Sequence, residues 1–140
     1  MTFDLGAIMD EVASVLGTVD GIDRTFAYPV ESVTPPAAIV TYPNAPGIAY
    51  MQTYGQGETS IGDLEAHLIA YRVTDRVARD TAAAWTANAG AQSVVAKLES
   101  HAWTSCDEVT VTSAEFAIQT VGSEQFLDVI FHLDITGPGA

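Results

Sequence analysis

The chain has few residues of the kinds that bind metals, and their spacing does not favour a metal site. His67, His101 and His132 are its three histidines, and no His-x-x-x-His or Cys-x-x-Cys motif is present. Transition metals are usually held by such residues at short fixed spacings, so we expect no metal ligands. His67 and His132 fall on the polar sides of two expected strands, where a solvated or hydrogen-bonded sheet histidine is the simpler interpretation.

Nucleophilic and phosphate-binding chemistry also lacks its usual motifs. The single cysteine, Cys106, cannot form an internal disulfide and has no base beside it in the sequence, so we interpret it as an inert thiol. A phosphate-binding loop needs a Gly-Lys-Ser/Thr end, but the only lysine, Lys97, lies in an expected helix far from Gly55 and Gly57. We therefore interpret Gly55-x-Gly57 as the tip of a hairpin.

Asp128 and Asp134 form the best candidate pair for acid catalysis among the 18 acidic residues. A catalytic acid pair requires one carboxyl whose pKa is raised by burial, whereas both of these residues alternate with apolar ones on the polar side of a strand. No Gly-x-Ser-x-Gly motif is present either. We expect a protein that is not an enzyme and that uses no cofactor.

Composition and charge indicate one folded domain and exclude two classes of partner. The chain has 140 residues, of which 48% are hydrophobic and 16% charged, as in a globular domain. Its formal net charge of −13 repels nucleic acid and anionic membrane surfaces. Its first residues have no basic region or apolar core typical of a signal peptide, and no membrane-spanning run follows. We expect a soluble protein made in the cytoplasm.

Residues 61–90 form the stretch around which the expected fold is organised. Leu64, Ala66, Leu68 and Ala70 alternate with polar residues and then with apolar ones, which indicates a strand that becomes covered on both faces. Asp75 fits the N-cap of a helix with an apolar stripe of Val77, Ala78, Ala82, Trp85 and Ala89, ended by Gly90. Ion pairs Asp75–Arg79 and Arg76–Asp80 are expected on its solvent side.

The other elements surround this strand and helix. Asp4 can cap a helix with apolar Leu5, Ile8, Met9, Val12 and Leu16, and Ser93 can cap a short helix with Val94, Val95 and Leu98. Proline-bounded strands are expected at 24–28 and 37–42, a strand at 48–54, and a final hairpin of 109–121 and 127–135. The prediction is a single α+β domain, a mainly antiparallel twisted sheet with two to three helices packed on one face.

Several segments taken together resemble the small tail terminator proteins of long-tailed actinobacterial phages. They are residues 28–40 (YPVESVTPPAAIV), 54–57 (YGQG), 73–80 (VTDRVARD), 90–94 (GAQSV) and 111–115 (VTSAE). The resemblance runs from the first helix to the last hairpin and includes no catalytic motif. The chain departs from the family at Gln56, where relatives often carry arginine.

The resemblance implies a structural virion protein. Terminators of this kind assemble in the host cytoplasm as a homo-oligomeric ring, usually a hexamer, on the head-proximal end of the tail tube. The ring stops polymerisation of the tube protein and offers the surface to which the head joins through its connector or stopper protein. DNA would only pass through the lumen, whose acidic wall would keep it from adhering.

Two other functions are compatible with the sequence. One is a different head–tail connector ring, an adaptor or a stopper. The other is a small-molecule-binding or enzymatic α+β domain that uses a pocket between the sheet and the helix after Asp75. For the assembly functions, our candidate partner-contact loop lies within residues 48–60, where aromatic side chains adjoin flexible glycines. Its residues are Tyr50, Met51, Tyr54, Gly55, Gln56 and Gly57.

Overall fold

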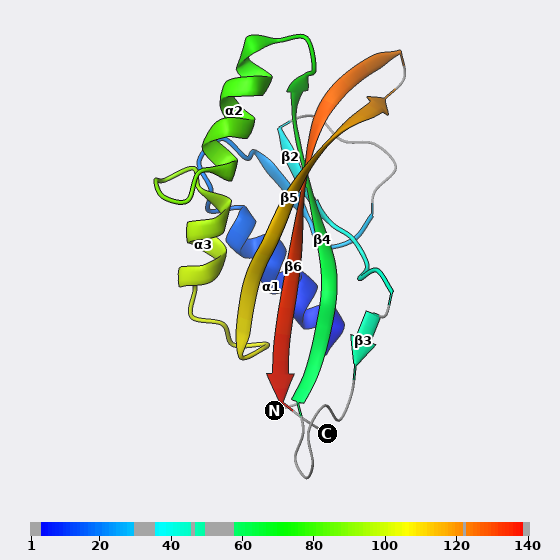
Figure 1. Ribbon diagram of the computed structural model, residues 1–140, viewed down its shortest axis with the longest axis vertical. Helices are drawn as coiled ribbons and strands as arrows, with labels where there is room; N and C mark the ends of the chain where they lie inside the picture. The colour runs from blue at the N-terminus through cyan, green and yellow to red at the C-terminus, as the bar shows by residue number, and fades with distance from the viewer. Residues whose placement is uncertain (1–3, 30–35, 46, 50–57, 122, 139–140) are drawn as a thin grey trace.

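One sheet covered on one face by helices makes up the fold in the computed structural model (Figure 1). The structure describes residues 4–29, 36–45, 47–49, 58–121 and 123–138. The elements in chain order are α1 (Leu5–Leu16), β1 (Arg24–Phe26), β2 (Ala37–Val40), β3 (Gly47–Ala49), β4 (Glu58–Arg72), α2 (Arg76–Thr86), α3 (Val94–Ser100), β5 (Glu108–Val121) and β6 (Glu124–Pro138). This confirms the predicted α+β class and the mainly antiparallel sheet.

The strand order in the six-stranded sheet is β1-β2-β4-β6-β5, and β3 pairs with one end of β4. Only β1 and β2 run parallel; the other pairings are antiparallel. The short strands β1 and β2 lie at one side of the sheet, with β1 at its edge. The long β6 lies between β4 and β5, so the centre of the sheet is formed by two strands far apart in the sequence.

The alternation predicted for the long strands is confirmed by burial. Leu64, Leu68, Phe131 and Leu133 are all fully buried on the face that the helices cover. Full burial of one such side chain contributes about 1.5–3 kcal/mol relative to exposure. This alternation leaves the intervening residues of β4 and β6 on the opposite side, which we call the helix-free face.

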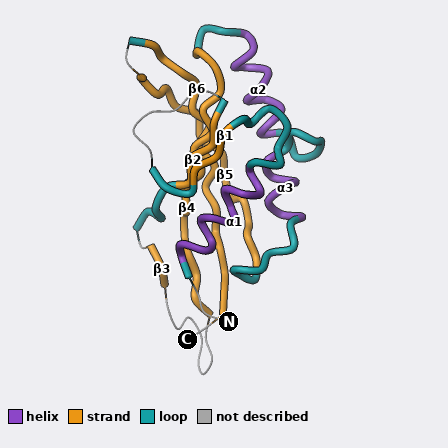
Figure 2. Tube along the Cα trace, turned by 180° about the vertical axis from the view of Figure 1, so that it is seen from behind, coloured by secondary structure: helices purple, strands orange, loops and turns teal. Residues whose placement is uncertain are grey.

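The three helices lie together on one side of the strands (Figure 2). The caps predicted for α1 and α3 are present: Asp4 Oδ1 accepts hydrogen bonds from the Gly6 and Ala7 amides at 2.9 and 3.3 Å, and Ser93 Oγ accepts from the Ala96 amide at 3.1 Å. The longest described helix has 12 residues, and none of the described helices has the length and apolar character needed to cross a membrane.

The N-cap position predicted for Asp75 is confirmed, although its side chain makes no cap hydrogen bond. Three other details predicted for this helix are wrong. Val77 is 55% exposed and does not belong to the buried stripe. The helix ends at Thr86, so Ala89 and Gly90 lie beyond it. The Thr86 hydroxyl donates to the Ala82 carbonyl at 2.9 Å, and the Ser93 hydroxyl donates to the Ala87 carbonyl, which satisfies the helix end without glycine.

The ion pairs on the solvent side of α2 were partly predicted. The Arg76–Asp80 pair is present at 3.8 Å. Arg79 contacts the neighbouring Asp80 at 2.9 Å, so the expected Asp75–Arg79 pair is wrong. Asp80 therefore lies near two guanidinium groups, and Asp75 contacts neither arginine among the described ion pairs.

Candidate functional site

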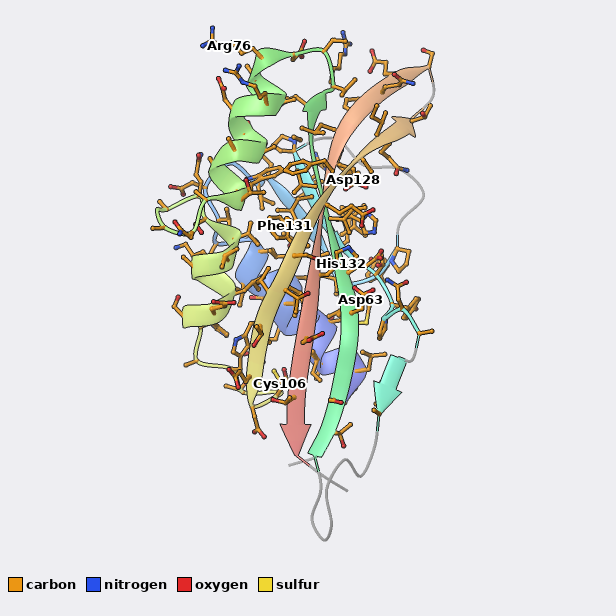
Figure 3. All side chains as sticks on the ribbon, in the orientation of Figure 1. Asp63, Arg76, Cys106, Asp128, Phe131 and His132 are labelled. Atoms are coloured by element: carbon orange, nitrogen blue, oxygen red, sulfur yellow. The ribbon has the colours of Figure 1, made fainter. Side chains whose placement is uncertain are left out.

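A network of histidines and carboxylates lies on the helix-free face, along the centre of the sheet. The strand register places Glu65 opposite His132 and Asp128 opposite Ile69, so β4 and β6 bring their polar residues to the same face. Figure 3 labels three members, Asp63 on β4 and Asp128 and His132 on β6. The network combines residues separated by about half the chain.

His67 lies between two carboxylates. Its Nδ1 is 2.8 Å from Asp128 Oδ2 and its Nε2 is 2.9 Å from Glu65 Oε1. A protonated imidazole can donate to both oxygens, and the hydrogen bond with Asp128 outweighs burial and raises the pKa of His67. The interpretation of His67 as a hydrogen-bonded sheet histidine is confirmed.

His132 is held in the same way by a second pair of carboxylates. Its Nδ1 contacts Asp63 and its Nε2 is 2.8 Å from Glu115 Oε1. Burial opposes protonation, but the hydrogen bonds with Asp63 and Glu115 outweigh it, so the pKa of His132 is raised. His132 is thus also a hydrogen-bonded histidine of the sheet.

A β-bulge in β4 directs Asp63 toward His132. The register shifts between Ile61 and Leu64, and Asp63 has a φ of 68°, in the left-handed region. The Asn44 amide holds the neighbouring carboxylates, donating to Asp63 Oδ2 at 2.9 Å and to Glu65 Oε2 at 2.5 Å. Chiefly through the hydrogen bond from Asn44, the pKa of Asp63 is lowered.

Asp63, Glu65 and His132 are the described residues that come closest to a metal-ligand set. Each offers one ligand atom, and the three atoms lie within 4.8 Å of one another. Both ring nitrogens of His132 already have carboxylate partners, Asp63 and Glu115, and the Asn44 amide occupies both Asp63 and Glu65. The arrangement is complete as a hydrogen-bonded network and does not by itself indicate a metal.

Asp128 and Asp134, the best catalytic pair by sequence, are not brought together as partners. Asp128 contacts His67, whereas Asp134 Oδ1 accepts from the Asp63 amide at 3.3 Å. Asp128 is 2% exposed, and its Oδ1 has no hydrogen-bond partner among the described residues. It lines a cavity of about 180 Å³ together with Pro29, Ile39, Thr41, His67, Ile69 and Gln119.

Glu11 forms a separate polar centre that attaches α1 to residues 101–105. It accepts hydrogen bonds from the Ser105 hydroxyl at 2.5 Å, the Ser105 amide at 2.9 Å and the Thr104 amide at 3.1 Å. His101 Nε2 lies 2.8 Å from it. Burial opposes ionisation, but these hydrogen bonds outweigh it and lower the pKa of Glu11 to about 2. The sequence analysis did not identify this centre.

Cys106 lies next to that centre and is 2% exposed. Burial, together with the negative charges of Glu11 and Asp107, raises the pKa of the Cys106 thiol to about 11. Because the thiolate is the reactive form, a thiol that stays protonated at neutral pH is unreactive. The geometry supports the interpretation of Cys106 as inert.

The part of the chain that the structure describes excludes the predicted partner-contact loop. Tyr50, Met51, Tyr54, Gly55, Gln56 and Gly57 all lie outside the described residues. Of the hairpin expected around this loop, β3 is described, and it pairs antiparallel with residues 60–62 of β4. These six residues remain a prediction.

A groove lies between α2 and the β5–β6 hairpin, where the sequence analysis considered a ligand pocket. Its volume is about 360 Å³, and its lining residues are Val73, Arg79, Ala82, Ala83, Thr86, Phe116 and Leu127. Most of these side chains are apolar, and the groove contains no cluster of titratable groups comparable to that on the helix-free face. The groove is therefore better suited to contact with a protein partner than to catalysis on a substrate.

No family model matches the chain, and no curated protein matches it significantly.

Proposed function

We propose that the protein is a tail terminator of a long-tailed phage, a ring-forming protein on the head-proximal end of the tail tube. The proposal is supported by the sequence segments that resemble this family and by the α+β domain with an open sheet. The observation that carries it is the edge strand β5. This strand has 14 residues and, among the described strands, pairs only with β6.

An unpaired edge of this length favours assembly with a neighbour. Apart from the Val111 amide, which donates to Glu99 Oε2 at 3.1 Å, its outer side presents backbone N–H and C=O groups that can pair with another chain. Soluble proteins usually shorten, charge or cover such an edge. Phe116 and Ile118 on β5 are 58% and 56% exposed. In a ring, a neighbouring subunit could cover both the open strand edge and these exposed apolar side chains.

A ring also suits the open form of the sheet. Cyclic rings are built from heterologous contacts, in which one surface of each subunit meets a different surface of the next. The tube protein would lie below the ring and a connector or stopper protein above it. With a formal charge of −13 for each copy, the ring would be strongly acidic and would let DNA pass without binding it.

The proposal is tested by electron microscopy of phage particles assembled without this protein. We expect tails of uncontrolled length that are not attached to DNA-filled heads, and restoration when the wild-type protein is supplied in trans. Tails of normal length beside heads that have lost their DNA would instead indicate a stopper or an adaptor. Intact infectious particles would overturn the proposal.

A further inference from the structure

The groove between α2 and the β5–β6 hairpin, called here the α2–β5 groove, is lined mainly by apolar side chains. Phe116 and Leu127 contribute to it from the sheet, and Ala82 and Ala83 from the helix. More than half of the Phe116 side chain is exposed. An exposed aromatic beside a groove of small side chains is a typical anchor point for protein contact.

Arg79 lines this groove, and Arg76 precedes Arg79 by three residues at the start of α2. Arg79 is bound to Asp80 through two nitrogens, at 3.1 and 2.9 Å, whereas Arg76 makes only the 3.8 Å contact with Asp80. The Arg76 side chain is 82% exposed, and it points away from the strands at the outer end of α2 (Figure 3). Its guanidinium group therefore has free donors.

The helix-free face has the opposite character. It carries Glu65, Glu115, Asp128 and Asp134, and no described ion pair links these carboxylates to a lysine or an arginine. Asp128 adds an oxygen without a described donor, next to the 180 Å³ cavity. This face can accept hydrogen bonds from basic groups, and bidentate guanidinium–carboxylate pairs are the strongest of these.

We propose that a second copy of this chain docks at the α2–β5 groove and places its helix-free face against Arg76 and Arg79. The inference rests on the proposed ring and names the two surfaces that would meet in it. The Arg76 donors that Asp80 leaves free can pair with carboxylates of the helix-free face. The two surfaces belong to different layers of the fold, so the contact is heterologous, as ring closure requires. The apolar rim of Phe116 and Ile118 supplies contact area, and the arginines fix which face docks.

Charge reversal tests the basic side of this contact. Arg76→Glu together with Arg79→Glu is expected to convert the ring into monomers in light scattering after size-exclusion chromatography. Arg24→Glu with Lys97→Glu changes the net charge by the same amount at sites away from the groove, and it is expected to leave the ring intact. Circular dichroism should give the two variants the far-ultraviolet spectrum of the wild type, which shows that both fold, because all four side chains lie at the surface or partly so.

A mixing experiment tests the acidic side. Glu115→Arg with Asp134→Arg should also give monomers. Combined in equal amounts, the basic-side and acidic-side variants should again form rings, because the altered surfaces then pair with each other and the unaltered surfaces remain compatible. Failure to reassemble, or loss of the ring in the Arg24/Lys97 control, would overturn the inference.

The outcomes separate this inference from the proposed function. A wild-type ring that caps tail tubes, combined with an intact ring of the Arg76/Arg79 variant, would overturn the inference and leave the function standing. A ring that depends on these residues but does not cap tubes would support the inference and overturn the proposed function. A metabolite that raises the melting temperature of the wild type by several degrees, but not that of Phe116→Arg, would show that the groove binds a small molecule instead of a second copy.

Discussion

Replacing Glu11 by glutamine measures how much the attachment of α1 to residues 101–105 contributes to stability. The substitution preserves the size of the side chain but removes its charge, and it replaces one acceptor oxygen by an NH₂ group that faces amide and hydroxyl donors. Five donor groups, from His101, Thr104 and Ser105, lie within hydrogen-bond distance of the Glu11 carboxylate. All five donors would lose their charged acceptor.

The expected magnitude follows from the pKa of Glu11. Hydrogen bonds lower this pKa from 4.5 to about 2, which corresponds to about 3 kcal/mol of stabilisation of the folded state at pH 7. The side chain is 15% exposed, so solvent screening takes little from this value. For a domain of this size, a loss of about 3 kcal/mol lowers the melting temperature by roughly 10 °C.

The pH dependence of the unfolding free energy gives a second test. Because the folded-state pKa is depressed, the stabilisation is present above pH 4.5 and is lost as the pH falls toward 2. At pH 3.5 it should have fallen from about 3 to about 2 kcal/mol. Urea unfolding at pH 7 and pH 3.5 measures both values, and Asp10→Asn, at an exposed position of the same helix, is the control. Equal urea midpoints for wild type and Glu11→Gln at pH 7, or a difference that does not shrink at pH 3.5, would refute this reasoning.

Three further predictions address other parts of the structure. Phe131→Ala should lower the unfolding free energy by about 3–5 kcal/mol in urea titrations because the ring is fully buried; a smaller loss would mean that the core refills. Asp128→Asn should lower the pKa of His67 in an NMR titration, since their hydrogen bond raises it; an unchanged midpoint would contradict the contact. Because the folded-state pKa of His67 is raised, the stability that this histidine contributes is full below pH 6.5 and is lost as the pH rises through the folded pKa. Cys106 should react with an aromatic disulfide reagent at pH 8 only after unfolding, because burial keeps the thiol protonated; fast labelling of the folded protein would contradict this.

Periodicity was sufficient to predict the long strands and the helix starts, which are determined by residues close together in the sequence. The alternation of residues 64–70 and 127–135 gave the central strands, and Asp4 and Ser93 marked two helix starts, because strand faces and caps depend on neighbouring residues. The end of α2 was missed because two hydroxyl groups satisfy its last carbonyls, and the hydrophobic pattern does not show this. Thr86 donates to Ala82, and Ser93, six residues beyond Ala87, donates to the Ala87 carbonyl.

The polar network could not be predicted because its geometry depends on sheet register. His132 and Asp63 are 69 residues apart, and they meet only when β6 pairs with β4 in the observed register. Ile61 and Leu64 are both buried although three residues apart, which strict alternation forbids. Only the bulge allows this, and the sequence signal for it is the short Gly62-Asp63 pair, in which Asp63 adopts a positive φ.

The position of β6 in the sheet has a consequence for synthesis on the ribosome. Because β6 separates β4 from β5, neither strand has its central neighbour until residues 124–138 have been translated. More than 50 residues are translated between the end of β4 and the start of β6, so β4 stays without this partner during that time. Contacts between residues so far apart in the sequence are typical of slow-folding proteins. During that interval α1, α2 and α3 can form locally but have no completed surface to cover, so we expect assembly of the sheet to be largely post-translational, with chaperones shielding the waiting strand.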